Sequence, residues 1–172
     1  MKLYPVIFRR RFLLIITIIS AVVASLIHFP ELISLFDVYE AFSLFPGMRG
    51  LDVAFEIIFT FLSLLVLFAI NTLVFRFDDK NVKIGIGHIA FSFVITWISS
   101  SCLGQFFVYL HEHFDIPAID AMVHHYLHPL RDFIITSIVT GSCYIIHLVG
   151  RQQSIQLENE QLRAESLQNQ YE

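Results

Sequence analysis

The sequence predicts an all-α integral membrane protein: a four-helix bundle with a cytoplasmic helical or coiled-coil extension at its C-terminus. Three observations predict it. Hydrophobic residues make up 56% of the 172 residues and charged residues only 15%, whereas soluble domains are about one quarter charged. Four long apolar stretches follow one another along the chain. A strongly polar segment rich in helix-forming residues follows the last of them.

A helix needs about 20 apolar residues to cross the hydrocarbon core of a bilayer. Four stretches reach or approach this length, and we expect spans at residues 12–29, 53–75, 84–110 and 129–149. They form a predicted transmembrane domain of residues 12–149, between a basic cytoplasmic lead of residues 1–11 and a cytoplasmic signalling helix of residues 150–172.

Basic residues predict the orientation of the spans, because Lys and Arg concentrate in cytoplasmic loops. Nine of the eleven precede the first span, lie between the second and third, or follow the fourth; only Arg49 and Arg131 lie elsewhere. Both termini are therefore expected in the cytoplasm. A cleaved signal peptide is the alternative for the first span, although its apolar run continues past the small residues around Ala24 to Phe29.

Local signals predict where these helices begin and end. Pro30 should end the first span, and Pro129 is well placed in the first turn of the fourth, where its missing N–H is not needed. The short basic loop 76–83 makes the second and third spans an antiparallel hairpin. Between the first and second spans, apolar residues at helical spacing predict a short helix on the outer membrane surface: Leu32, Leu35, Phe36, Tyr39 and Phe42.

Small residues in the fourth span predict close helix packing. Ser137 and Gly141 are four residues apart, as are Thr136 and Thr140. This spacing lets helices approach closely in lipid, either within one bundle or between two protomers. The two cysteines, Cys102 and Cys143, belong to no CxxC spacing and are expected to pack as apolar groups.

Five of the eight histidines lie between residues 111 and 128. If residues 118–128 are helical, Asp120, His124 and His128 share one face, where they could bind a metal such as zinc, with His111 and His113 completing the site. The same histidines could instead sense pH, since free histidine titrates near pH 6.5. They could also simply lie at the level of the lipid headgroups.

Charged residues gather at the expected outer boundary of the membrane: His28, Glu56, Arg131 and Asp132. A charge inside hydrocarbon costs a few kcal/mol unless it is paired or hydrated, so Glu56 should face the bundle or a water-filled cavity. Arg131 is its expected partner, with His28 as the alternative. Such a group could either lock the bundle with a salt bridge or line a ligand pocket.

Two other functional classes stay open. His88 and His147 lie at similar depth on neighbouring spans and could ligate a haem. Asn71 and the serines at 99–101 could line a transport path, although such residues more often form hydrogen bonds between helices. Motifs of soluble nucleotide-binding enzymes and hydrolases are missing. The net charge of −4 and the placement of the basic residues give no support to nucleic-acid binding.

The polar tail beyond Gly150 has the composition of a signalling helix. Ile155 and Leu162 are seven residues apart, and a second stripe with the same repeat contains Leu157, Ala164 and Tyr171, with Leu167 beside it. The two stripes leave the register open. A solvated helix of this length is only marginally stable alone, so we expect it to pair with a second copy in a homodimer. Because the chain stops in mid-pattern, we expect that it continues in a longer protein.

These features resemble the membrane-sensor region of LytS/YehU-like bacterial sensor histidine kinases, which act in two-component systems with LytTR-type regulators. The resemblance rests on the hairpin around Asn71-Thr-Leu-Val-Phe-Arg76 with its basic loop, and above all on the tail Leu157-ENEQLRAESLQNQ-Tyr171. In that family such a helix leads to an Asn-Pro-His-Phe phosphoacceptor segment and an ATP-binding domain. Neither lies in this sequence, so no catalytic residue is carried over.

The resemblance implies a sensor and dimerisation region in the bacterial inner membrane. An outer or intramembrane signal would pass through the fourth helix to a cytoplasmic coiled coil. This segment would hold no cofactor apart from the possible metal ion at its histidines. ATP and Mg²⁺ would bind in the kinase portion, which would pass a phosphoryl group to a response regulator. The implied partners are thus the bilayer, a second copy and that regulator.

Overall fold

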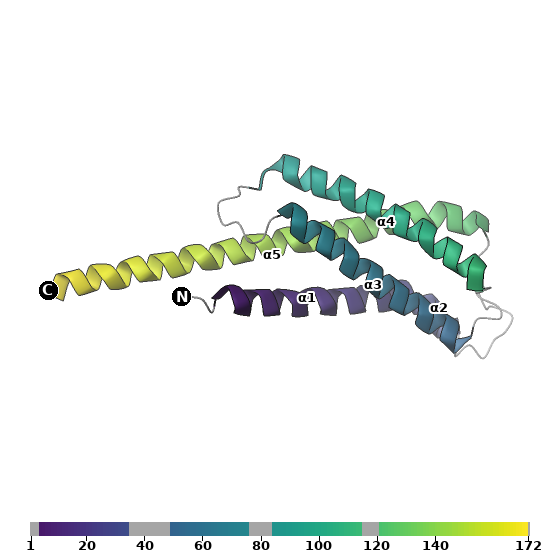
Figure 1. Ribbon diagram of the computed structural model, residues 1–172, viewed down its shortest axis with the longest axis horizontal. Helices are drawn as coiled ribbons and strands as arrows, with labels where there is room; N and C mark the ends of the chain where they lie inside the picture. Colours follow the sequence, from purple (N-terminus) through teal and green to yellow (C-terminus); the bar gives the residue numbers. More distant parts are fainter. Residues whose placement is uncertain (1–3, 35–48, 76–83, 115–120, 172) are drawn as a thin grey trace.

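The computed structural model describes residues 4–34, 49–75, 84–114 and 121–171, and these ranges hold helices and no strand (Figure 1). The prediction of an all-helical protein is confirmed. The elements are α1 (Tyr4–Ile27), α2 (Phe29–Ser34), α3 (Gly50–Phe75), α4 (Ile86–Phe114) and α5 (Ala121–Tyr171).

Three of these helices are long and apolar enough to cross a membrane, as judged within the described ranges. They are α3, α4 and the part of α5 from His128 to Gln170. The apolar part of α1, Arg11–Ile27, is shorter. α1 ends at Ile27, and α2 begins two residues later at Phe29. Pro30 is tolerated in α2 because it lies in the first turn of that helix. The chain is thus compatible with a multi-pass membrane protein.

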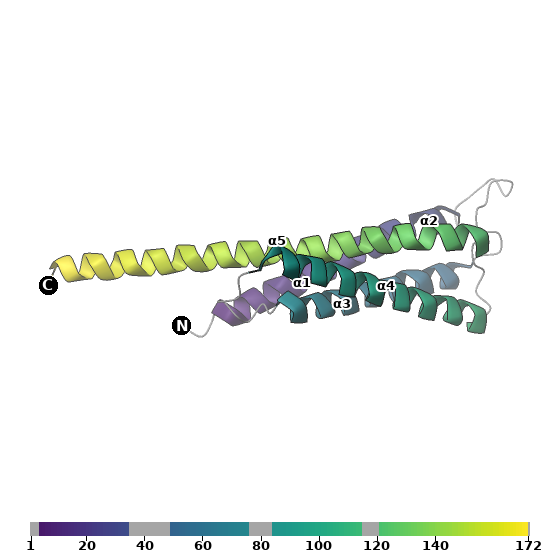
Figure 2. The same cartoon turned by 90° about the horizontal axis from the view of Figure 1, so that it is seen from above.

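The four long helices lie side by side, and α3 contacts each of the other three (Figures 1 and 2). α4 also packs against α5. The apolar core forms where α1, α3 and α5 meet, from Ile16, Ala24, Leu64, Leu67, Phe68, Phe75, Ile135, Val139 and Cys143. α5 runs on past the ends of the other helices as a single projecting helix, and we call its residues 151–171 the tail.

The distribution of polar side chains is inverted relative to a water-soluble bundle. Large apolar residues are exposed along every long helix, among them Leu14, Leu62 and Ile98. Hydroxyl and amide side chains are buried instead, at Ser20, Thr60, Asn71, Ser92, Thr96, Ser100, Thr136 and Thr140. In lipid, the apolar effect does not distinguish inside from outside, so helices associate by close packing and by hydrogen bonds between polar side chains. This arrangement suits a bundle whose outer surface contacts hydrocarbon.

Asn71 ties three helices together. Its Nδ2 donates to Thr96 Oγ1 of α4 at 2.6 Å and to the carbonyl of Leu67 at 2.9 Å. Its Oδ1 accepts a short hydrogen bond from Ser92 of α4 and a longer one, 3.5 Å, from Thr140 of α5. Asn71 therefore forms a structural link within the bundle.

The start of α5 differs from the prediction. Pro129 does not begin the helix but lies inside it, because the helix already starts at Ala121. An internal proline removes one backbone hydrogen bond and normally disfavours a helix. Here the residues beside it bind other side chains: His128 contacts Arg131, and Asp132 accepts hydrogen bonds from α4. We attribute the continuity of the helix to these interactions.

The short surface helix predicted after the first span is described only in its first part. α2 covers Phe29–Ser34 and includes Leu32, whereas Leu35, Phe36, Tyr39 and Phe42 lie outside the described residues. The hairpin loop 76–83 also lies outside them. Both cysteines are free thiols, with Cys143 buried and Cys102 exposed.

Candidate functional site

Four ionisable side chains meet at the end of the bundle opposite the tail. They are His28, which follows α1, Glu31 of α2, Glu56 of α3 and His111 of α4. We call this group the His–Glu cluster. All four residues are at most 9% exposed. Such residues are rarely fully buried without partners, which makes the cluster the leading candidate for a functional site.

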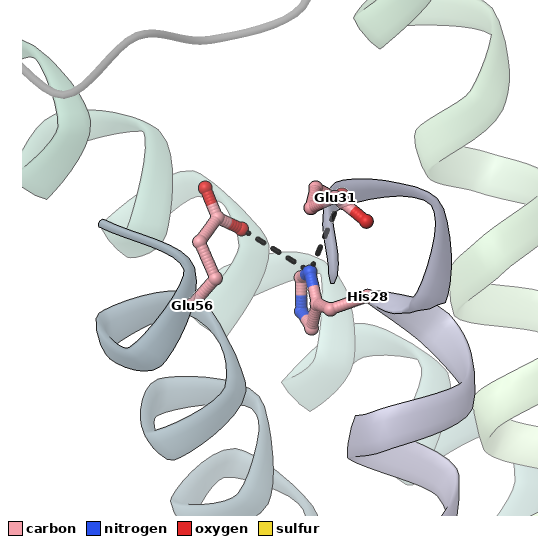
Figure 3. Close-up of side chains that lie close together, drawn as sticks. All are labelled: His28, Glu31 and Glu56. Carbon is pink, nitrogen blue, oxygen red and sulfur yellow. Dashed lines mark hydrogen bonds and ion pairs between the residues drawn. The ribbon is translucent and has the colours of Figure 1, made fainter. Parts of the chain in front are cut away.

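His28 lies at the centre of the cluster. Its Nδ1 lies 3.4 Å from Glu31 Oε1 and 3.4 Å from Glu56 Oε2 (Figure 3). The other ring nitrogen, Nε2, forms a 2.7 Å hydrogen bond with Thr60 Oγ1. Since Glu56 and Thr60 are four residues apart on α3, one face of this helix holds both the carboxylate and the hydroxyl that contact His28.

His111 approaches the cluster from α4. Its Nε2 lies 3.0 Å from Glu56 Oε1, but without the alignment of a hydrogen bond. Neither ring nitrogen has a hydrogen-bond partner among the described residues. The ring packs edge-on against Phe107, with centroids 4.3 Å apart. Glu56 therefore lies between two imidazoles, each contacting a different carboxylate oxygen.

A second polar group lies between α4 and α5. Asp132 accepts hydrogen bonds from Ser100 Oγ at 2.9 Å and from Ser101 Oγ at 3.3 Å. Arg131 Nη2 lies 3.6 Å from Asp132 Oδ1 and 2.9 Å from His128 Nδ1. Gly104 leaves room for this arginine, because a Cβ there would come within 3.2 Å of Arg131 Nη2. These contacts hold α5 against α4.

A small cavity lies beside this second group. Its volume is about 30 Å³, enough for a water molecule but far below that of a pocket for a drug-sized ligand. Its polar lining includes Thr60, Ser63, Ser100 and Arg131. The cavity therefore offers hydration to buried polar groups and too little space for an organic substrate.

The four residues predicted to form one charge cluster form two separate pairs instead. His28 lies beside Glu56, and Arg131 lies beside Asp132. Glu56 contacts its alternative predicted partner His28 and also His111, whereas Arg131 contacts Asp132 and His128. Sequence reasoning missed the role of Glu31, although its spacing of three residues from His28 was visible. It also missed Thr60, for which the spacing of four from Glu56 was the available signal.

The structure describes part of the predicted metal-binding stripe. Asp120 and the side chain of His124 lie outside the described residues. His128 contacts Arg131, His111 belongs to the His–Glu cluster, and His113 is exposed and stacks on Tyr109. Of the predicted haem ligands, His88 is exposed and His147 is partly buried.

The apolar residues of the tail are exposed along one uninterrupted helix. Ile155 is 49% exposed, Leu157 41%, Leu162 58% and Leu167 56%. Ala164 is exposed as well, and the side chain of Tyr171 lies outside the described residues. Several large apolar side chains exposed on a projecting helix are typical of a surface that another helix covers.

Comparison with known proteins adds no assignment. The chain matches no protein-family model and has no significant match among curated proteins or solved structures.

Proposed function

We propose that this chain is the membrane-embedded input and dimerisation region of a signalling protein, and that α5 carries its output. One observation carries the proposal: α5 is a single helix of 51 residues that runs from the end of the bundle holding the His–Glu cluster to the end of the tail. At a rise of about 1.5 Å per residue, it spans about 77 Å. A continuous helix can transmit a shift, a rotation or a tilt over that distance.

The proposed arrangement in the membrane is a four-helix bundle with both termini in the cytoplasm. α1 serves as the fourth span, because its apolar segment begins beside Arg11, which can extend to the headgroups. The bias of Lys and Arg supports this orientation. The His–Glu cluster then lies near the outer surface, and the tail lies in the cytoplasm.

The proposed output is a paired tail. The exposed Ile155 and Leu162 are seven residues apart, Leu157 begins a second stripe with the same repeat, and pairing with a second copy would cover one of the two stripes. Within the bundle, Thr136 and Thr140 are buried, whereas Ser137 is exposed and a Cβ added at Gly141 would meet nothing within 4 Å. Ser137 and Gly141 are thus available for a contact between protomers, as small residues at this spacing allow.

The specific class we propose is the sensor region of a two-component histidine kinase. Its support is the composition of the tail, which resembles the helix that precedes the phosphoacceptor segment in the LytS/YehU-like family. A bundle with two packings would bias the tail toward one of two pairings, and the kinase would respond to that choice. The small cavity gives little support to a transport function. The exposed position of His88 gives little support to haem binding.

Cysteine scanning of the tail tests the proposed pairing. Cys102 and Cys143 are replaced by Ala in the full chain, and single cysteines are placed at successive positions from Ile155 to Leu167. In proteoliposomes, oxidation should cross-link positions on one helix face with a period near seven residues. Equal and low cross-linking at every position, with a monomer in sedimentation, would contradict the proposal. Phosphorylation of the full-length gene product on histidine from ATP tests the kinase class separately.

A further inference from the structure

We propose that the His–Glu cluster binds a divalent transition-metal ion of the Zn²⁺ class. The ligands would be His28 Nδ1, Glu31, Glu56 and His111 Nε2. This site differs from the histidine stripe that the sequence predicts, because it draws its ligands from α2, α3, α4 and the residue after α1. It also stands independently of the proposed signalling function.

Three separations between candidate ligand atoms are close to those in a tetrahedral metal site. With metal–ligand distances of about 2.0–2.1 Å, two ligand atoms in a tetrahedral site lie about 3.3 Å apart. In the cluster, His28 Nδ1 lies 3.4 Å from an oxygen of Glu31 and 3.4 Å from an oxygen of Glu56, and His111 Nε2 lies 3.0 Å from the other oxygen of Glu56. One ligand atom from each of His28, Glu31 and Glu56 fits within a mutual separation of 4.8 Å.

The same distances are long for an ordinary ion pair. Hydrogen bonds between a protonated histidine and a carboxylate are usually about 2.7–2.9 Å. A proton on His28 Nδ1 would instead be shared by two carboxylates, each 3.4 Å away. An ion placed among these atoms would contact all of them at once. Its two charges would also balance those of the two carboxylates, with both imidazoles neutral.

His111 provides independent evidence. This residue is only 8% exposed, and both of its ring nitrogens lack a hydrogen-bond partner among the described residues. A buried polar group without such a partner costs about 1–3 kcal/mol. Its Nε2 faces Glu56, so a small movement would place it on an ion bound to the cluster. Metal binding would replace the poorly aligned contact of this nitrogen with Glu56 by a direct metal–ligand bond.

Thr60 supplies the outer support that a ligating histidine needs. Histidines bound to metals almost always use their second ring nitrogen in a hydrogen bond, which fixes the tautomer and the ring orientation. His28 Nε2 can donate to Thr60 Oγ1 at 2.7 Å, which leaves Nδ1 free of a proton and directed at both glutamates. The ring is therefore already held in the orientation required for ligation through Nδ1.

The test is a titration of the full chain, in detergent micelles, with Co²⁺ as a spectroscopic probe and Zn²⁺ as competitor. We expect one Co²⁺ per chain with the intense visible absorption of tetrahedral coordination, and its loss when Zn²⁺ is added. His28→Gln, Glu56→Gln and His111→Gln should each weaken binding at least about tenfold, since each removes a ligand. Glu112→Gln is the matched control, because Glu112 is exposed and adjacent to His111; it should bind like the wild type.

A milder pair of variants covers the case in which loss of a ligand disturbs folding. Thr60→Val keeps the shape of the side chain but removes the acceptor for His28, and we expect binding weakened by about ten- to a hundredfold. Thr60→Ser should restore it. The proposal is overturned by absent Co²⁺ binding, by an octahedral spectrum, or by unchanged affinity in folded Glu56→Gln and Thr60→Val. Loss of binding with His113→Gln but not with Glu56→Gln would likewise assign the metal to the histidine stripe instead.

Discussion

Asn71 of α3 donates a 2.6 Å hydrogen bond to Thr96 of α4, at a position where both side chains are fully buried. Inside a membrane, such a bond is one of the few forces that select one packing of apolar helices over another. The accompanying bonds from Ser92 and Thr140 extend this link to the helix that carries the tail. The polar interior therefore sets how α3, α4 and α5 fit together.

Replacing Asn71 by Leu should destabilise the bundle. The substitution leaves the hydroxyls of Ser92, Thr96 and Thr140 without their shared partner, and single interhelical bonds in membranes are worth about 0.6 kcal/mol and at most about 1.7 kcal/mol. We expect a loss of about 1–3 kcal/mol in the free energy of unfolding, measured by denaturation in mixed micelles. Thr72→Val is the control, because its hydroxyl binds a carbonyl of its own helix. An equal effect of both variants would contradict the assigned role.

Leucine at Gly104 should be poorly tolerated, whereas leucine at Gly141 should leave the monomer intact. A Cβ at Gly104 already approaches Arg131 Nη2 to 3.2 Å and His128 Nδ1 to 3.5 Å. Overpacking of this kind costs about 1–3 kcal/mol. Gly141 has open space around it within one chain. Thermal unfolding followed by circular dichroism should show a lower midpoint for Gly104→Leu alone; equal midpoints would argue against the α4–α5 packing described above.

The same Gly141→Leu variant tests the contact between protomers. If Ser137 and Gly141 form that contact, the larger side chain should weaken self-association at least several-fold without lowering helix content. Sedimentation in density-matched micelles measures this directly. Phe133→Ala, at an exposed position on the same helix, serves as a comparison that removes bulk instead of adding it. Unchanged association of Gly141→Leu would contradict the proposed contact through Ser137 and Gly141.

Insertions between Gly150 and Arg151 should show whether α5 transmits a rotation from the bundle to the tail or only connects the two. An insertion of four residues rotates the tail by about 40° relative to the bundle, whereas seven residues restore its phase to within about 20°. In the full-length kinase that we propose, we expect the four-residue insertion to change autophosphorylation and the seven-residue insertion to retain most of it. Equal activity of the two variants would mean that the helix only anchors the output domain.

The boundaries of α3 and α4 could be predicted closely from the sequence, because the length of an apolar stretch is a local property of the chain. The expected span 53–75 ends at the same residue as α3. The expected span 84–110 begins two residues before α4 begins. The predicted start of the fourth helix was wrong, because α5 begins at Ala121 and contains Pro129. Three residues after this proline, Asp132 accepts a hydrogen bond from Ser100 of α4. Local signals cannot reveal such interactions.

The site was harder to predict than the helices. Contacts such as those of Glu56 with His28 and His111 depend on how three helices are rotated about their axes, and a nearly uniform apolar sequence fixes that rotation weakly. Arg131 was the nearest opposite charge by membrane depth, yet Asp132 and His128 contact it more closely. His28 was named as the alternative partner of Glu56, whereas the uncharged side chain of Thr60 gave no electrostatic signal that would have marked it as a partner of His28.

The most direct test of the central claim compares the tail in two states of the bundle. Cysteine cross-linking of positions Ile155 to Leu167 is measured in proteoliposomes for the wild type and for Glu56→Gln, with Glu112→Gln as the control. If α5 carries changes from the cluster to the tail, Glu56→Gln should alter which positions cross-link, and Glu112→Gln should not. An identical cross-linking profile in all three proteins, with the Glu56→Gln bundle folded, would contradict the account.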